Sequence, residues 1–247
     1  MPASALLIGA SVASLNLCTD EYLLLLARHH EIASVSFLSQ DRQESPLWRS
    51  ARHYPANRGS IEDVLVHRPD VVLVMGGGGR ATRLLAGRLH IRAVELVSAN
   101  SLQDVAANLR SVAAALGDPR RAQPWLAKLT QLQRTKPISG RDAVWLSGGG
   151  QSLAAGSIGT QWLRLAGLEQ RALPGGRASL ETLLVRPPAV LVESHYRSAQ
   201  VSSGTRWLDH PIVRRVKSRR LATDGRAWTC MGPLMIGEIE RLRAASR

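Results

Sequence analysis

The chain has 247 residues and a hydrophobic fraction of 45%, so it can bury a core as one large domain or two small lobes, and disorder is not expected. Its net charge of +13 comes almost wholly from arginine and favours an anionic partner: nucleic acid, a membrane surface or an acidic ligand. No apolar run approaches the roughly 18 residues that a membrane span needs, and the two cysteines form neither a CxxC pair nor a zinc-type cluster.

The first half of the chain predicts alternating strands and helices. Unbroken apolar runs such as 71–74 are typical of parallel strands covered on both faces, and the amphipathic stretches between them predict βα units. Ser101, three residues before Asp104, is an N-cap signature for a helix. The expected elements lie at 6–17, 20–29, 32–38, 60–68, 70–75, 81–89, 91–97 and 101–116.

The second half repeats this alternation after a helical stretch. Residues 120–134 have helical spacing and end before Pro137. Strand and helix patterns then follow at 142–148, 160–168, 179–186, 189–194, 210–218, 220–224 and 233–245. The pattern predicts an N-terminal α/β lobe over 1–117, a connecting helix over 118–137 and a C-terminal α/β lobe over 138–247.

The two halves also share a sequence repeat. Residues 60–74, SIEDVLVHRPDVVLV, align without gaps with residues 179–193, SLETLLVRPPAVLVE. In each copy a serine, Ser60 or Ser179, can cap a short helix that leads to a buried strand. The repeat favours two similar lobes facing one another, against chance similarity between two amphipathic βα units.

Two glycine runs, Gly76–Gly79 and Gly148–Gly150, each follow a predicted strand. Open parallel sheets bind ligands at the carboxyl ends of their strands, so these turns are expected to form walls of a cleft. As a phosphate loop the first run fits poorly, because residues 80–82 are Arg-Ala-Thr where the P-loop has Lys followed by Ser or Thr.

Four stretches of this chain, in order along nearly its whole length, resemble the periplasmic substrate-binding proteins of ABC importers for cobalamin and ferric siderophores. They are 13–27, 58–74, 175–192 and 228–242. The resemblance implies an α/β fold with two Rossmann-like lobes joined by a single long connecting α-helix around 119–134, and a ligand cleft between the lobes. It implies a non-enzymatic protein with no cofactor of its own, whose cargo is a metal chelate.

The resemblance also implies docking on the permease through one acidic residue on each lobe. Glu181 matches the second-lobe position, and the repeat makes Glu62 its counterpart. In the cobalamin binder the first-lobe acid lies after the glycine turn, where this chain has no acid at residues 80–82. The alternative for both glutamates is a carboxylate that interacts favourably with a helix N-terminus.

The same resemblance points to ligand contacts on loops of the expected cleft. Arginines there could pair with carboxylates or hydroxamates of an anionic chelate, or could simply be solvated. A methionine stands where the cobalamin binder has an aromatic wall. The predicted ligand-binding residues are Arg58, Met75, Gly76, Gly77, Arg80, Gln151, Arg177, Tyr196 and Trp228.

The cysteines and histidines predict no metal cage. Cys18 and Cys230 fall on loops at the cleft side, and we expect free thiols rather than a disulfide. The seven histidines cannot be arranged from sequence as the His/His/carboxylate cage of the related metal-ion binders, so no metal ligand is assigned. They are His29, His30, His53, His67, His90, His195 and His210.

We therefore predict a monomeric solute-binding protein that delivers cobalamin, a related corrinoid or a ferric siderophore to the permease subunits of an ABC importer, and meets the membrane only through them. The expected location is the periplasm. No complete signal peptide follows Met1, so the cytoplasm is expected if Met1 is the true start. Two alternatives stay open: a cytoplasmic α/β enzyme that binds a phosphorylated substrate at Gly76–Gly79, and a nucleic-acid binder that uses the arginine-rich run 214–220.

Overall fold

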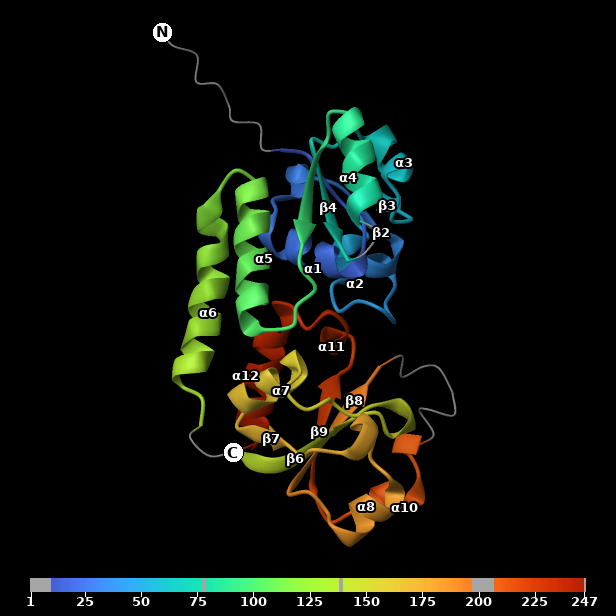
Figure 1. Ribbon diagram of the computed structural model, residues 1–247, viewed down its shortest axis with the longest axis vertical. Coiled ribbons are helices and arrows are strands. Elements are labelled where there is room, and N and C mark those ends of the chain that lie inside the picture. The colour runs from blue at the N-terminus through green and yellow to red at the C-terminus, as the bar shows by residue number, and fades with distance from the viewer. Residues whose placement is uncertain (1–9, 77–78, 138–139, 197–206, 247) are drawn as a thin grey trace. The chain divides into compact units, whose positions relative to one another are not determined.

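The computed structural model describes residues 10–76, 79–137, 140–196 and 207–246, and the chain divides into two compact units (Figure 1). Unit 1 comprises residues 1–42, 47–98 and 106–124, and unit 2 comprises residues 43–46, 99–105 and 125–247. Each unit has one parallel sheet with helices packed on it, which confirms the predicted α/β class. The lobe boundaries proposed from sequence remain a prediction.

Unit 1 contains a five-stranded sheet in the order β3-β2-β1-β4-β5, with every pair parallel. The strands are β1 (Val12–Ser14), β2 (Ile32–Ser36), β3 (Ala56–Asn57), β4 (Val71–Met75) and β5 (Arg92–Leu96). The α-helices are α1 (Leu17–Leu26), α2 (Trp48–Ala51), α3 (Ile61–Val64), α4 (Gly79–Arg88) and the greater part of α5 (Leu102–Ala115). Short 3-10 turns are η1 (His29–Glu31), η2 (Phe37–Gln40), η3 (Leu65–His67) and η4 (Pro119–Ala122).

The apolar run at 71–74 forms β4, which is buried along this stretch as its sequence predicts. Alternate side chains of a strand point to opposite faces. Val72 and Val74 pack in one cluster with Ile61, Val64 and Ala86 of the α3 and α4 segments. Helices therefore cover this part of the sheet. Both faces of β4 are buried, so the strand is apolar throughout and does not alternate between apolar and polar residues.

Unit 2 contains a four-stranded parallel sheet in the order β7-β6-β8-β9. The strands are β6 (Arg141–Leu146), β7 (Leu168–Gln170), β8 (Val190–His195) and β9 (Arg219–Asp224). The α-helices are most of α6 (Gln123–Arg134), with α7 (Ile158–Leu165), α8 (Leu180–Val185), α10 (Pro211–Arg215), α11 (Ala227–Cys230) and α12 (Leu234–Ser246). The 3-10 turns are η5 (Gly148–Gly150) and η6 (Pro174–Gly176).

The sequence repeat is also a structural repeat. The Oγ atoms of Ser60 and Ser179 accept hydrogen bonds from backbone N–H groups three residues on, at 3.2 and 3.0 Å, and so cap α3 and α8. The strands that follow, β4 and β8, occupy equivalent places, because each pairs with the first strand of its own unit. The strands β2, β1, β4 and β5 of unit 1 therefore correspond in order to β7, β6, β8 and β9 of unit 2, and β3 has no counterpart. This correspondence agrees with the similarity of the two halves that the repeat predicts.

The predicted connector is helical where it was expected: η4 leads directly into α6. That this is the single connection between two lobes remains a prediction. No helix in the described part of the chain is long and apolar enough to cross a membrane.

A buried ion pair fixes the start of this helical stretch in unit 1. The guanidinium of Arg121 donates to both carboxylate oxygens of Glu31, at 2.5 and 2.8 Å, and their side chains are 14% and 1% exposed. The hydrogen bonds from Arg121 hold the pKa of Glu31 below its ordinary value, although burial opposes this shift. Removal of Glu31 would leave the buried guanidinium of Arg121 with the weaker counter-charge of Asp118, at 3.8 Å.

We expect Glu31→Gln to lower the free energy of unfolding by about 2 kcal/mol, because Arg121 stays buried with only the longer contact to Asp118, at 3.8 Å, as counter-charge. A matched control is Glu169→Gln, which removes the pair between Arg164 and Glu169 at 2.8 Å, with side chains 55% and 49% exposed. The control should cost less than about 1 kcal/mol. Urea denaturation measures both, and equal losses would contradict the structural role of the Glu31–Arg121 pair.

Candidate ligand-binding site

The strand order of each unit has one switch point, the place where open α/β sheets bind their ligands. In unit 1, β2 lies on one side of β1 and β4 on the other, and in unit 2 β7 and β8 flank β6 in the same way. At such a switch point the following loops diverge and leave a crevice at the carboxyl ends of the two central strands. The candidate site is therefore described from the ends of β1 and β4, and of β6 and β8.

In unit 1, Asn16 organises the crevice. Its Oδ1 accepts hydrogen bonds from the N–H groups of Cys18 and Thr19 at 3.1 and 3.0 Å, which caps α1. Its Nδ2 donates to the carbonyl of Met75 at the end of β4, at 3.4 Å. Asn16 thus joins the two strand ends. The sequence interpretation did not select it, although an Asn directly before a helix is a recognisable cap.

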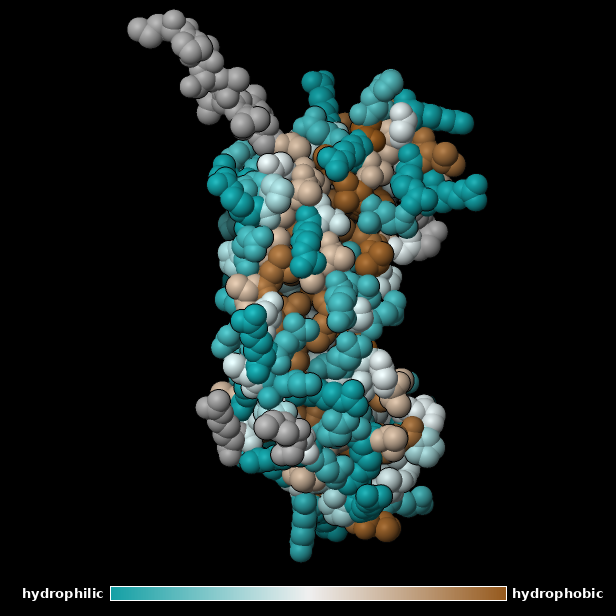
Figure 2. All heavy atoms as spheres, turned by 60° about the vertical axis from the view of Figure 1, so that its left-hand side comes forward, coloured by the Kyte–Doolittle hydropathy of each residue, from teal (hydrophilic) through white to brown (hydrophobic). Residues whose placement is uncertain are grey.

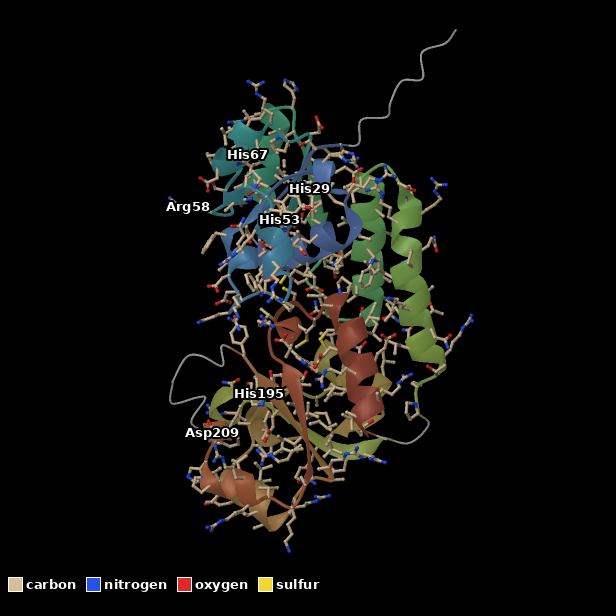
Figure 3. The ribbon with its side chains drawn as sticks, turned by 180° about the vertical axis from the view of Figure 1, so that it is seen from behind. His29, His53, Arg58, His67, His195 and Asp209 are labelled. Atoms are coloured by element: carbon tan, nitrogen blue, oxygen red, sulfur yellow. The ribbon has the colours of Figure 1, made fainter. Side chains whose placement is uncertain are left out.

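The predicted residues of unit 1 lie at the end of β4, on α4 and after β3, and β1 and β2 separate β3 from β4 in the sheet. Met75 ends β4 and is half-buried, and Gly76 follows with φ +87°, where an added Cβ would meet no atom within 4 Å. Only glycine adopts that conformation without strain. Arg80 is exposed on α4, and Arg58 is exposed after β3, at the margin of unit 1 (Figure 3). Gly77 lies outside the described residues.

Behind this edge lies a buried polar network around Asp20. Asp20 is 0% exposed, and its carboxylate accepts hydrogen bonds from the N–H of Ser36 at 3.1 Å and from the Ser36 hydroxyl. Burial raises its pKa from 3.8 to about 7, while hydrogen bonds from Ser14 and Ser36 oppose the shift. Because Ser14 and Ser36 end β1 and β2, this network sets the positions of both strand ends.

In unit 2, two loops at strand ends are joined side by side. Gln151, after β6, forms an antiparallel bridge with Arg177, after β7. The Arg177 guanidinium donates to the Gly149 carbonyl at 2.6 Å, and the Ala178 N–H donates to the Gly150 carbonyl at 2.9 Å. The structure therefore brings together Gln151 and Arg177, two residues that the sequence interpretation assigned separately to the same wall. Both are exposed.

The ends of β8 and β9 approach each other closely. A Cβ on Gly225 would lie 2.6 Å from the Cβ of Tyr196 and 2.8 Å from Oγ of Ser194, so only glycine fits there. The Tyr196 hydroxyl donates to the Glu44 carboxylate. His195, at the end of β8, is exposed (Figure 3). His195 was not selected from the sequence, where nothing marks it among seven histidines.

Trp228 lies in the interior of unit 2. Its side chain is only 4% exposed, its Nε1 donates to Oγ1 of Thr223 at 2.7 Å, and its ring packs on Trp145 with centroids 5.2 Å apart. This burial leaves little of the ring accessible from outside the unit. A ligand contact through Trp228 remains a prediction.

The two predicted docking acids occupy equivalent exposed positions. Glu62 is the second residue of α3 and Glu181 the second residue of α8, directly after the capping serines. Both carboxylates lie beside a helix N-terminus, where negative charge is favourable, so each glutamate also has a local structural role. Their docking role is a separate proposal.

The expected free thiols are wrong. Cys18 and Cys230 are both disulfide-bonded in the structure, and neither is free. A disulfide requires Cβ atoms about 3.8 Å apart. Sequence positions carry no measure of that separation, so a lone pair of distant cysteines could not be assigned from the sequence.

The arginine-rich run 214–220 is largely engaged within unit 2. Arg214 pairs with Asp209 at 2.9 Å, and Arg220 pairs with Glu193 and donates to the Val213 carbonyl at 2.8 Å. Arg219 donates to the Ala245 and Ser246 carbonyls. The contacts of Arg219 and Arg220 stabilise β9 within unit 2, whereas the pair of Arg214 with Asp209 is exposed, with side chains 65% and 70% accessible. Nucleic-acid binding by this run stays a sequence-based alternative.

No group of three or more His, Cys, Asp or Glu side chains that could hold a metal ion occurs among residues 10–76, 79–137, 140–196 and 207–246.

No protein-family model matches the sequence, and no curated protein is significantly similar to it. Solved structures do match. The chain superposes on the periplasmic haem-binding protein HutB of Vibrio cholerae with TM-score 0.73, 18% identity, and 95% and 98% of the two chains covered. The periplasmic haem-binding protein RhuT from Roseiflexus sp. RS-1 gives TM-score 0.70, 20% identity, and coverage of 96% and 97%.

A periplasmic haem-binding protein from Pseudomonas aeruginosa gives TM-score 0.65, 20% identity, and coverage of 96% and 92%. At these identities the likeness establishes the fold. The chain has the α/β fold of the two-lobed periplasmic solute-binding proteins, in agreement with the resemblance found in its sequence. Coverage above 90% on both sides means that the likeness extends over both units and is not limited to one.

The raised pKa of Asp20 predicts a specific pH dependence. Between its ordinary pKa of 3.8 and about 7, the folded protein keeps a proton that the unfolded chain has lost, so Asp20 makes stability fall as pH rises through this window. Asp20→Asn removes this dependence. The free energy of unfolding of the variant minus that of wild type, both measured by urea denaturation, should therefore increase as the pH rises from 5 to 8. Parallel pH profiles for the two proteins would contradict a buried, titrating Asp20.

Proposed function

We propose that this chain is the solute-binding component of an ABC importer, that it works on the outer side of the cytoplasmic membrane as a monomer, and that it binds a metal chelate without catalysing a reaction. The observation that carries the proposal is the match of both units to solved periplasmic binding proteins. Met75, Gly76, Gln151 and Arg177 also lie at the carboxyl ends of parallel strands, the usual ligand position in such sheets.

Haem is the cargo we favour. Three of the matching structures are of haem-binding proteins. Haem carries two carboxylates, and exposed arginines at the strand ends, Arg58, Arg80 and Arg177, are suited to pair with them. Cobalamin and ferric siderophores, the chelates expected from the sequence, remain alternatives within the same class.

The direct test is a titration of the purified protein with haemin, cyanocobalamin, cobinamide and a ferric siderophore, with ATP as control. We expect a saturable shift of the haem absorption band with a dissociation constant of about 1 µM or tighter. Tight binding of cobalamin or of the siderophore instead would correct the cargo and keep the transport role. Binding of ATP alone would reject both and favour an enzyme that uses the turn at Gly76–Gly79.

His195 is a candidate iron donor, because it is an exposed imidazole at the end of β8, beside the crevice of unit 2. Haem iron in proteins is commonly held by His or Tyr. We expect His195→Ala to alter the absorption spectrum of bound haem and to weaken binding. His53→Ala, which removes an exposed histidine of unit 1, is the control and should leave the spectrum unchanged. Identical spectra for both variants would exclude His195 as a donor.

Glu181→Ala tests the docking role. If Glu181 meets the permease and not the chelate, the variant should bind haem as wild type does and should not support uptake. Glu240→Ala, which removes an exposed glutamate of α12, should retain both binding and uptake. A loss of haem affinity in Glu181→Ala would remove the docking assignment.

A further inference from the structure

The amino ends of the strands in unit 1 form an edge of the sheet that the candidate site does not include. Val12 of β1 is paired with Ile32 of β2 and with Val71 of β4. Val71 is in turn paired with Arg92 of β5. The loops that enter these four parallel strands therefore lie side by side, opposite the carboxyl ends where open α/β sheets bind their ligands. We call this row of entering loops and strand starts the amino edge.

The amino edge exposes basic side chains from three of its loops. One group precedes β2, one residue precedes β4, and a second group joins the end of α4 to the start of β5. These exposed residues are Arg28, His29, His30, Arg68, Arg88, His90 and Arg92. Within the part of the chain that the structure describes, no carboxylate is paired with the guanidinium of any of the four arginines.

The acidic residues near the amino edge do not balance this charge. Glu31 is 1% exposed and is already paired with Arg121. Asp118 pairs with Arg120 at 3.0 Å. Asp70 is exposed, and its carboxylate accepts a backbone hydrogen bond at 2.8 Å. The four arginines of the edge are thus accompanied by one exposed carboxylate that has no basic partner, and the amino edge keeps a positive charge.

Apolar groups accompany the positive charge. Leu89 lies between two of the basic residues and is 39% exposed. The chain also enters the sheet at this edge, because Ser11 directly precedes β1, and the sequence of residues 1–9 is MPASALLIG, without a charged side chain. Single exposed hydrophobic residues are normal on a protein surface, and Figure 2 shows several on one face. At the amino edge they adjoin unpaired arginines, a combination typical of surfaces that bind membranes.

We propose that the amino edge of unit 1 binds the surface of a membrane that contains anionic phospholipids. Guanidinium groups pair well with lipid phosphates, and each one near such a surface strengthens binding about fivefold. Leu89 contacts the boundary between head groups and acyl chains. A nucleic acid would pair with the same arginines but would leave Leu89 in water, so we favour the membrane. The sequence predicts contact with the membrane only through a permease, and this inference adds a direct contact that does not depend on the cargo.

Binding of the purified protein to vesicles tests the proposal. We expect it to sediment with vesicles that contain phosphatidylglycerol and not with vesicles of phosphatidylcholine alone, and to be released as salt is raised. Arg88→Gln/Arg92→Gln should weaken binding about 25-fold, and Leu89→Ser about fivefold. The matched control is Arg110→Gln/Arg134→Gln, which removes two exposed arginines of α5 and α6 and the same total charge. The control should change binding by less than about twofold.

Four outcomes would overturn the proposal. They are no binding of wild type to the anionic vesicles, equal binding to both kinds of vesicle, equal losses in the two double variants, and unchanged binding of Leu89→Ser. A duplex oligonucleotide is titrated under the same conditions. If it binds more tightly than the anionic vesicles and Arg88→Gln/Arg92→Gln abolishes this binding, the edge is a nucleic-acid site and the proposal is wrong. None of these measurements contains a chelate, so they can fail while the haemin titration succeeds, and the reverse.

Discussion

Each unit depends on the parallel pairing of two buried central strands, β1 with β4 and β6 with β8. Parallel pairing forces the loops that follow these strands to leave from the same edge of the sheet, and the reversal of strand order separates them there. Asn16 crosses the gap in unit 1 through its bond to Met75. In unit 2 the glycine turn after β6 and the end of β8 flank the corresponding gap. The location of the candidate site is therefore a consequence of the sheet topology.

Much of the fold could be predicted from sequence because its signals are local. The apolar run 71–74, the serines before α3 and α8 and the repeat each describe a few adjacent residues, and all correspond to elements of the structure. The strand order is not local, yet the repeat indicated that both halves share it. What could not be predicted depends on distance in space. The Asp20–Ser36 network joins α1 to the end of β2, and the disulfide state of the cysteines requires two Cβ atoms to meet.

The arginine surplus shows why composition alone is a weak guide to a ligand. Several arginines stabilise the interior of one unit or the other. Arg121 pairs with Glu31, Arg226 pairs with Asp224, and Arg243 donates to the carbonyls of Leu132 and Leu165. A guanidinium has five N–H donors, so one arginine can donate hydrogen bonds to several carboxylate or carbonyl oxygens at the ends of helices and strands. The arginines left exposed at strand ends are few. Under the proposed function, these arginines, and not the net charge, would be the groups available to an acidic chelate.

Unit 2 incorporates a short segment from much earlier in the chain, residues 43–46. The Glu44 carboxylate accepts a hydrogen bond from the hydroxyl of Tyr196, which is 152 residues further along the sequence. The Ser45 carbonyl accepts a hydrogen bond from the guanidinium of Arg226, which is 181 residues further along. Contacts of such sequence separation close very long loops, and loop closure slows folding. The sheet of unit 2 can form from the continuous stretch of chain that contains β6 to β9. The hydrogen bonds of Tyr196 and Arg226 form only after residues 43–46 have also packed on this unit. During synthesis the ribosome releases 43–46 long before its partners, so the ligand-side loops of this unit would be among the last parts of the molecule to reach their final form.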